Sequence, residues 1–388
     1  MTYPTIRPEL TLDFANSRQL DPRITFSRSS GATYLNPDTG LITLASDHEA
    51  RFEKEGLLIE ESRTNYMNYS IFSFNTQQGT NIVKENNTPD IAAPDGTFTA
   101  THITADSINY LNSQFPSPAS TDVGKQFTYS YWVYVVSCTP RSGSGTDTDN
   151  TIRLGIDTNS VLSYVNRTVE KNKWVRIQVT TSNTYVSGKN VQCSMFRDNK
   201  DVDLYVWGFQ CENGSSSTSL IPTSGSASTR ALDIARITGN NFSSWYNQTE
   251  GTMFVSMSDG VRSDLGANLY GSHSADRIVM LASSNSRFRY QATGQATSSW
   301  TNANIYSAND VRTAGPMKYA YAYKPDDYAL SVKGSTLTTE RDPQPNVITL
   351  KLGEESAFGG NGRPNAAISR IAYYPRRLTN AELEAITL

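Results

Sequence analysis

The sequence predicts an all-β protein in which an N-terminal β-hairpin module precedes two β-sandwiches. Three observations support this fold class. The chain of 388 residues contains 21 Tyr together with many Thr and Ser, and these residues favour strands and turns. Extended runs of Leu, Ala, Glu and Lys, which long helices need, are missing. Short β-forming segments recur between Gly, Pro, Asn and Ser, as is typical of sandwiches.

The first element is a hairpin. The segment 36–40 reads Asn-Pro-Asp-Thr-Gly and predicts a turn, because Pro fixes φ, Asp bonds its own backbone and Gly allows positive φ. Its flanks at 32–35 and 41–44 are rich in β-forming residues, so we expect them to pair. The apolar run at 56–59 predicts a buried strand.

Three charged residues follow that run: Glu60, Glu61 and Arg63. An acid pair beside an arginine is one way to build a catalytic site. The alternative is a group of ion pairs that ends a strand and needs no function. Nothing elsewhere in the sequence supplies a catalytic partner, so we interpret the three residues as structural ion pairs.

A second domain is expected at 75–225. The segment 127–136 alternates strictly, which places one set of side chains on a single face of a strand. That set is Phe127, Tyr129, Tyr131, Val133 and Val135. Two tryptophans in other predicted strands, Trp174 and Trp207, either belong to the core or offer their ring faces to sugars.

A linker at 226–235 and a third domain at 236–388 complete the chain. The segment 214–230 is rich in Ser and Gly, but Leu220 and Ile221 in its middle predict that it docks on a neighbouring surface.

The linker and the end of the chain carry local signals of their own. We expect Arg230 and Asp233 to pin the linker. The segment 371–375 predicts the last strand. Thr379 and Glu382 then have the capping-box spacing of a helix N-terminus, so a short helix should end the chain.

Charge and cysteine content argue against several classes of protein. A formal net charge of −3, with 18% charged residues, gives no electrostatic case for nucleic-acid binding. The N-terminus lacks the features of a signal peptide, and no run of about 18 apolar residues occurs, so we expect no membrane insertion. An odd number of cysteines without CxxC spacing predicts buried reduced thiols at Cys138, Cys193 and Cys211.

The residues suited to chemistry form no recognisable constellation. No Gly-x-Ser-x-Gly motif occurs, and the three histidines are far apart in sequence. Carboxylate pairs lie in predicted loops or at strand ends, at Glu60/Glu61, Asp147/Asp149, Asp326/Asp327 and Glu354/Glu355. We therefore predict that the chain is not an enzyme and has no catalytic residue, no metal ligand set and no cofactor.

Three pieces near the N-terminus carry a family resemblance. The pieces DFANS, TFSRSSGATYLNPDTG and GLLIEESRTN, in this order, resemble the N-terminal module of tailed-bacteriophage virion proteins, the head-spike, head-fibre or tail-fibre proteins. The closing strand DLYVWGFQCE, which runs on into SLIPTSGSASTRALD, is also similar to the phage version.

The two larger domains resemble ligand-binding folds. FTYSYWVYV, KNKWVRIQVTT and DLYVWGFQCENG are similar to the galactose-binding-like jelly roll of carbohydrate-binding modules. The segments 318–323, 327–333 and 368–374 are similar to the concanavalin/laminin-G-like sandwich. That fold sometimes holds a calcium ion on loop oxygens, which would point here to Asp259, Asp264 and Asp276.

The resemblance implies a virion structural protein, made in the host cytoplasm and exposed on the particle as a head spike, decoration or fibre. Residues 1–74 would attach it to other virion proteins, and the sandwiches would bind host-surface glycans with Trp174 and Trp207. A homo-oligomer, as a trimer, is expected from the symmetry of virion appendages. The alternatives are a tail-associated receptor-binding protein, a glycan depolymerase and a scaffold without ligand. On this interpretation, deleting residues 1–65 would leave both sandwiches folded.

Overall fold

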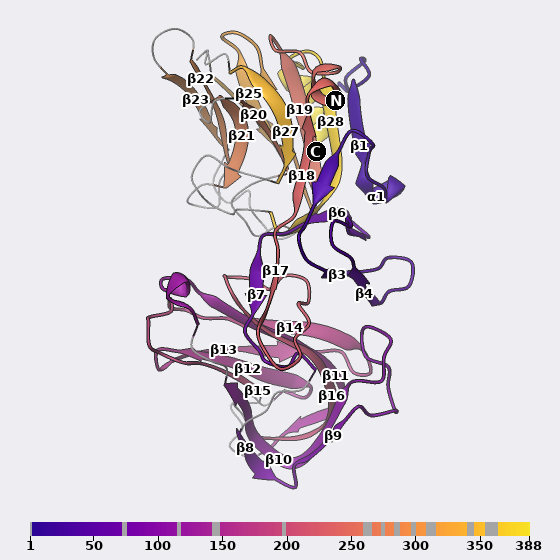
Figure 1. The fold of residues 1–388 in the computed structure, drawn as a ribbon, viewed down its shortest axis with the longest axis vertical. Helices are drawn as coiled ribbons and strands as arrows, with labels where there is room; N and C mark the ends of the chain where they lie inside the picture. The colour runs from indigo at the N-terminus through magenta and orange to yellow at the C-terminus, as the bar shows by residue number, and fades with distance from the viewer. Residues whose placement is uncertain are drawn as a thin grey trace. The chain divides into compact units, whose positions relative to one another are not determined.

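The computed structural model describes most of the chain (Figure 1). The described residues are 2–71, 76–114, 118–141, 148–195, 199–258, 266–272, 276–282, 288–295, 300–307, 316–339, 345–353 and 364–388. Nearly all their regular structure is β-strand, so the predicted all-β class is confirmed. The chain forms two compact units. The first unit comprises Met1–Thr39, Ala45–Ser62 and Ala231–Leu388, and the second comprises Gly40–Leu44 and Arg63–Arg230.

The first unit is a sandwich of two antiparallel sheets. Sheet A has the order β26 (Ser335–Thr339), β25 (Tyr328–Val332), β24 (Met317–Tyr323), β19 (Gly251–Met257), β28 (Ala366–Tyr374), β6 (Gly56–Ile59) and β5 (Phe52–Glu53), and β1 (Leu10–Asp13) also pairs with β28. Sheet B has the order β2 (Thr25–Ser27), β18 (Ile234–Thr238), β27 (Val347–Leu352), β20 (Ala267–Gly271), β21 (Arg277–Ala282), β22 (Phe288–Gln295) and β23 (Trp300–Tyr306).

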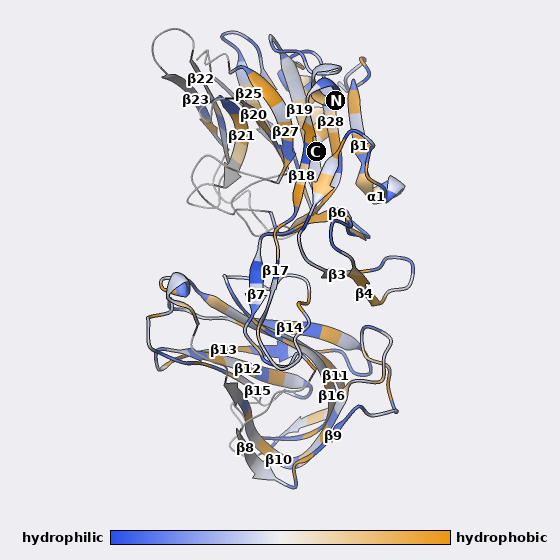
Figure 2. Ribbon diagram, viewed as in Figure 1, coloured by the Kyte–Doolittle hydropathy of each residue, from blue (hydrophilic) through white to orange (hydrophobic). Residues whose placement is uncertain are grey.

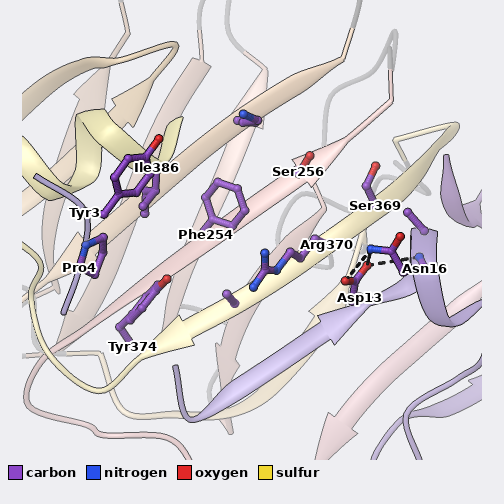
Figure 3. Close-up of a pocket in the computed structure, with 13 residues that line it drawn as sticks. Tyr3, Pro4, Asp13, Asn16, Phe254, Ser256, Ser369, Arg370, Tyr374 and Ile386 are labelled. Atoms are coloured by element: carbon purple, nitrogen blue, oxygen red, sulfur yellow. Dashed lines mark hydrogen bonds between the residues drawn. The ribbon is translucent and has the colours of Figure 1, made fainter. Parts of the chain in front are cut away.

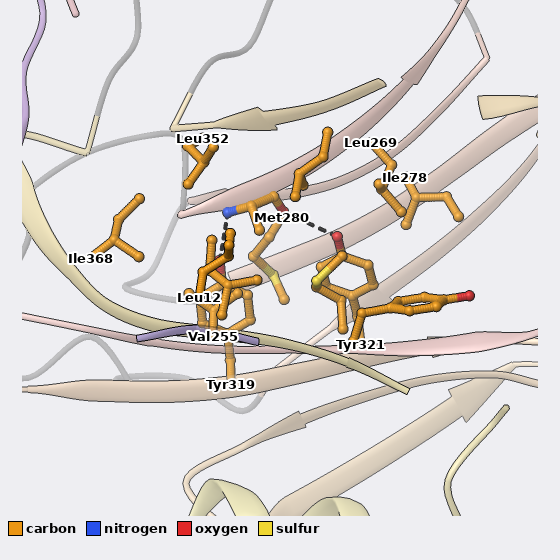
Figure 4. Close-up of a cluster of buried hydrophobic side chains, with 14 of the residues drawn as sticks. Leu12, Val255, Leu269, Ile278, Met280, Tyr319, Tyr321, Leu352 and Ile368 are labelled. Atoms are coloured by element: carbon orange, nitrogen blue, oxygen red, sulfur yellow. Dashed lines mark hydrogen bonds between the residues drawn. The ribbon is translucent and has the colours of Figure 1, made fainter. Parts of the chain in front are cut away.

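One hydrophobic core lies between these sheets (Figure 4). Sheet A contributes Leu12, Val255 and Tyr319, and sheet B contributes Leu269 and Met280, all with 2% exposure or less. Since successive strand residues face opposite sides, every second residue points away from the core and forms the outer face of its sheet.

Short helices complete the first unit: α1 (Phe14–Ser17), α2 (Asn240–Ser243) and α3 (Asn380–Thr387). The predicted capping box of α3 is confirmed, because the Thr379 hydroxyl accepts from the Glu382 backbone N–H and the Glu382 carboxylate accepts from that of Thr379. The outer face of sheet A packs small residues against this helix, with Ala320, Ala322 and Leu383 fully buried.

The N-terminal segment is part of the first sandwich, which differs from the predicted separate module at 1–74. β1 and β6 both pair with β28 along one edge, with Leu12 opposite Ile371 and Ile59 opposite Ala366. This pairing satisfies an edge that would otherwise expose unpaired backbone groups. Local composition could not reveal it, because the partners lie far apart in the sequence.

A glycine allows this close approach. Gly56 has φ +131°, and a Cβ placed on it would lie 2.1 Å from the carbonyl oxygen of Ile368. A side chain at this position would therefore push β6 away from β28.

The predicted hairpin is confirmed as a two-stranded sheet of β3 (Ala32–Leu35) and β4 (Ile42–Ala45). Its turn chemistry differs in one respect from the prediction. The Asn36 side chain, and not that of Asp38, accepts the backbone N–H groups of the turn, while Asp38 forms an ion pair with Arg18.

The charged residues around this segment form a buried network in the first unit. Asp233 binds Arg28 through one carboxylate oxygen, at 3.1 Å, and Arg51 through the other, at 2.6 Å. Arg51 also binds Glu60 at 2.7 Å. All four side chains are at most 3% exposed. The interpretation of Glu60 as a structural ion-pair residue is therefore confirmed, as is the pinning role of Asp233.

The network is closed by backbone groups. The Glu60 backbone N–H donates to Asp233, and Arg28 and Arg51 donate to the carbonyl groups of Ser46 and Thr33. Burial alone would lower the pKa of Arg51, but the Glu60 and Asp233 carboxylates outweigh burial and raise that pKa.

The second unit is one branched sheet around its own core. Its path is β13 (Val161–Thr168), β12 (Thr151–Thr158), β15 (Val191–Met195), β10 (Thr101–Gln114), β16 (Lys200–Asn213), β11 (Phe127–Pro140) and β14 (Trp174–Thr180). The branches are β7 (Arg63–Asn65), β17 (Ser228–Arg230), β8 (Thr76–Thr80) and β9 (Val83–Asn86). The five residues predicted to share one face of β11 all have 0% exposure, which confirms the alternation.

Two short polar strands hold the end of the segment 214–230 in the second unit. β7 and β17 pair, and both are hydrophilic (Figure 2). Leu220 and Ile221 are each 4% exposed, and Arg230 donates to the Thr218 hydroxyl, so the predicted docking of the segment 214–230 is confirmed. The three cysteines are buried and free, as predicted.

Candidate functional site

A groove of about 450 Å³ runs over the outer face of sheet A (Figure 3). Its lining comes from the N-terminal segment, the end of β1, helix α1, the strands β19, β24 and β28, and helix α3. The lining residues are Tyr3, Pro4, Asp13, Ala15, Asn16, Phe254, Ser256, Lys318, Ser369, Arg370, Ala372, Tyr374 and Ile386.

The register of the strands explains the floor of this groove. Phe254 of β19 lies opposite Ala372 of β28 on one side and Ala320 of β24 on the other. On both adjacent strands the residue next to Phe254 is therefore an alanine. Because a methyl group is small, the partly exposed aromatic ring projects beyond these neighbours. Tyr374 is also partly exposed, and Tyr3 is 62% exposed at the rim.

The next row of the same face is polar. Asp13 lies opposite Arg370, Arg370 opposite Ser256, and Ser256 opposite Lys318, so one row crosses β1, β28, β19 and β24. Both oxygens of Asp13 accept hydrogen bonds from the Asn16 side chain, at 2.9 and 2.8 Å. Within the residues that the structure describes, the side chains of Arg370, Lys318 and Ser256 have no hydrogen-bond or ion-pair partner, although their backbones pair in the sheet.

The two rows influence each other electrostatically. Burial raises the pKa of the Tyr374 hydroxyl, while the positive charge of Arg370 acts in the opposite direction. Tyr374 therefore stays protonated at neutral pH and can donate a hydrogen bond in the groove.

These features suit binding better than catalysis. A partly exposed aromatic ring beside unpaired hydrogen-bond donors can hold a ring-shaped polar ligand. Of the described residues that line the groove, Asp13 alone carries a carboxylate. Both of its oxygens accept hydrogen bonds from the Asn16 side chain. Acid–base hydrolysis of a glycoside normally needs two carboxyl groups facing the scissile bond.

The predicted tryptophans lie on another surface, in the second unit. Trp207 is 3% exposed, donates its indole N–H to the Thr99 hydroxyl at 3.0 Å, and meets Trp132 edge-on. Trp174 is partly exposed and donates its indole N–H to the carbonyl of Ala92 at 2.9 Å. Both face the outer side of the sheet, on either side of β11, but only Trp174 retains an accessible ring surface.

Trp174 ends a row of rings. His102 of β10 stacks on Tyr205 of β16, with ring centroids 4.4 Å apart and an interplanar angle of 10°. Tyr205 contacts Tyr134 of β11, and Tyr134 contacts Trp174 of β14. His102 is also held by Asp203 at 2.8 Å, so this end of the row is already occupied by a protein group.

The other predicted groups fall in three classes. Asp259, Asp264, Asp147, Glu354 and Glu355 lie outside the described residues, so the calcium hypothesis stays a prediction. Asp276 is described, and no cluster of three potential metal ligands occurs in the described ranges. Asp327 forms an ion pair with Arg377, and Glu61 bonds Asn365, so these carboxylates have structural partners.

The groove itself was missed by the sequence reading. Its residues come from strands at both ends of the chain, and only the register of sheet A brings them into two rows. One signal was present in the segment 317–323, MKYAYAY, where small residues alternate with tyrosines. Such alternation indicates a face with room for a covering element or a ligand.

Comparisons with known proteins give no family assignment. No family description matches the chain, and no curated protein is similar in sequence. None of the helices formed by the described residues has the length and apolar character needed to cross a membrane.

Some solved structures show limited similarity. The CBM40 of a Ruminococcus gnavus IT-sialidase is 14% identical over 37% of this chain and 84% of its own, with a TM-score of 0.30. A leech intramolecular trans-sialidase is 12% identical over 36% of this chain and 23% of its own, with the same TM-score. A Trypanosoma rangeli sialidase is 14% identical over 39% of this chain and 25% of its own, with a TM-score of 0.29. Similarity at this level carries no functional argument.

Proposed function

We propose that this chain is a surface protein of a tailed-bacteriophage virion that binds host-surface glycans through the groove on sheet A. The resemblance of its N-terminal segment to virion proteins supports the first part of the proposal. The second part depends on one observation. The Phe254 ring lies between Ala372 and Ala320, beside the row that holds the unpaired side chains of Arg370, Ser256 and Lys318.

The chemistry of sugars fits this surface. A pyranose has an apolar face of C–H groups that packs on an aromatic ring, and a rim of hydroxyls that hydrogen-bond to polar side chains. Phe254 supplies the ring, while Ser256, Tyr374 and Lys318 supply hydrogen-bond donors around it.

The groove is open, so a single site is expected to bind weakly, with a dissociation constant on the order of millimolar. Many copies on one particle would raise the avidity about 10²–10⁴-fold. A homo-oligomer, such as the trimer expected for a fibre, is part of this proposal.

Substitution of the floor tests the glycan-binding part. Phe254→Leu keeps an apolar side chain but removes the aromatic face, so it should weaken glycan binding by about tenfold. Phe98→Leu is the matched control, because Phe98 is 56% exposed in the second unit. Glycan-array and calorimetric binding would be compared for both variants and the wild type. Equal affinity of the three proteins would refute the groove as the binding site.

Trp174 is the competing surface. If its partly exposed ring carries the contact instead, Trp174→Leu and not Phe254→Leu should lose binding. The same samples answer the enzyme alternative, because new reducing ends released from host polysaccharide would identify a depolymerase and not a binding protein.

The virion part needs a separate test. Antibodies against the chain should label purified phage particles in electron microscopy, and mass spectrometry should find it among the particle proteins. A chain absent from purified particles would refute a virion role while leaving glycan binding untouched.

A further inference from the structure

The groove on sheet A is positively charged, although the chain as a whole is acidic. Arg370 and Lys318 contribute two positive charges and Asp13 contributes one negative charge, which leaves the groove at +1, whereas the chain has a net charge of −3. Both cations are exposed and have no ion-pair partner among the described residues.

The two cations lie on either side of one hydroxyl. Arg370 is opposite Ser256 on one neighbouring strand, and Lys318 is opposite it on the other. Neighbouring strands are about 4.8 Å apart, so the two cationic Cα atoms are separated by about 10 Å. Both side chains are long enough to reach a small anion held above Ser256.

Asp13 does not close this site. It lies opposite Arg370 in the register, but its two oxygens accept from the Asn16 side chain, and no ion pair joins it to Arg370 in the part of the chain that the structure describes. The Asp13 carboxylate therefore marks one end of the polar row, and the anion position lies at the other end, between β28 and β24.

Phe254 sets the distance from a sugar ring to this anion position. It is two residues from Ser256 on β19 and on the same face, so their Cα atoms are about 7 Å apart. A pyranose stacked on Phe254 would therefore direct a substituent of its ring toward Ser256.

We propose, on the basis of the proposed glycan-binding function, that the groove selects sugars that carry a carboxylate. The sugar ring packs on Phe254, the carboxylate accepts a hydrogen bond from Ser256, and Arg370 and Lys318 flank it. The two cations lie on opposite sides of Ser256, and a carboxylate offers two oxygens, one toward each cation. Sulfated sugars share the single charge and are distinguished by experiment.

Salt should weaken such binding. The cations are exposed, so their attraction for a carboxylate is screened over about 10 Å at an ionic strength of 0.1 M. Affinity for an acidic glycan should therefore fall as salt is raised, and affinity for a neutral glycan should not.

The test uses the full chain and pairs of glycans that differ only in charge. The probes are uronate and sialylated oligosaccharides, the same compounds after chemical reduction of their carboxyl groups, and sulfated counterparts. Arg370→Gln and Lys318→Gln remove each charge, Arg370→Lys keeps it, and Lys54→Gln removes an exposed charge elsewhere in the first unit. Thermal unfolding of each variant verifies that it is folded.

We expect binding to the carboxylated members, a loss of about tenfold or more on carboxyl reduction, and a similar loss for Arg370→Gln and Lys318→Gln. Arg370→Lys should lose less, and Lys54→Gln should bind like the wild type. Equal binding of acidic and reduced glycans, or of the Gln variants and the wild type, would overturn the acidic preference and leave glycan binding intact. Preference for the sulfated members would replace carboxylate by sulfate. Absence of binding to every probe would refute the proposed glycan-binding function itself.

Discussion

Replacing Asp233 by Asn should destabilise the first unit more than any change at the surface of the molecule. Asn has nearly the same shape, so the substitution removes charge without creating a cavity. Asp233 binds Arg28 and Arg51 through its two oxygens and also accepts the backbone N–H of Glu60. After the change, Arg28 would lose its ion pair with Asp233, and Arg51 would keep only the one with Glu60.

The size of this effect follows from the burial of the network. Both Asp233 and Arg28 have side chains with 0% exposure, so water cannot replace the lost carboxylate. Removing one partner of a buried ion pair typically costs about 3–5 kcal/mol. Because the whole stability of a domain is only about 5–15 kcal/mol, the first unit should become marginal.

Differential scanning calorimetry can separate the two units. The transition of the first unit should shift down strongly in Asp233→Asn, and that of the second unit should stay in place. Asp38→Asn is the matched control in the first unit, because Asp38 pairs with Arg18 at the surface, with its side chain 76% exposed. Such pairs contribute about 0–1 kcal/mol. A shift no larger in Asp233→Asn than in Asp38→Asn would refute the argument for the network.

Three further perturbations test other parts of the structure. Deleting residues 2–62 should unfold the first unit, since it removes β1, β2, β5 and β6; an unchanged calorimetric transition of that unit would contradict the strand pairing. Raising the pH should destabilise the first unit. Burial raises the pKa of Tyr373 from 10 to about 12, so the phenol loses its proton at lower pH in the unfolded chain than in the folded one. The stability that this difference contributes is fully present below pH 10 and is lost by about pH 12, which costs the first unit roughly 2–3 kcal/mol. Phenolate absorbance that reaches its full value before the near-ultraviolet circular dichroism changes would contradict this. Deleting residues 2–8 leaves β1 intact but removes Tyr3 and Pro4 from the groove, so it should keep the first unit folded and lower glycan affinity several-fold. An unchanged affinity would show that Tyr3 and Pro4 take no part in binding.

Local elements were predicted well because their signals are local. The alternation of β11, the hairpin turn and the capping box of α3 each depend on residues a few positions apart. The ion-pair interpretation of Glu60 also held, although its partner Arg51 and the shared Asp233 were not paired with it from the sequence.

The division into domains was not predicted, because it depends on long-range pairing. β1, β2, β5 and β6 belong to the sandwich formed by residues 231–388, and nothing in their own composition indicates this. The deletion of residues 1–65, expected from the sequence to leave both sandwiches folded, is now expected to unfold the first unit.

The candidate site was not predicted for the same reason. Arg370, Ser256 and Lys318 are unremarkable surface residues in the sequence, and they form a row only because β28, β19 and β24 pair in one register. Tryptophans attract attention as sugar platforms, but Trp207 is used in packing, with 3% exposure.

The position of the N-terminus constrains the two proposed roles of this chain. Tyr3 and Pro4 line the groove, and Ile6 packs against the cluster under α3, so residues 2–9 lie beside the proposed glycan site. A virion partner that bound residues 2–9 would cover the rim formed by Tyr3 and Pro4. Attachment through this segment and glycan binding in the groove therefore compete. If both proposals hold, the attachment surface must lie away from residues 2–9, and the deletion of residues 2–8 should impair glycan binding while leaving incorporation into particles unchanged.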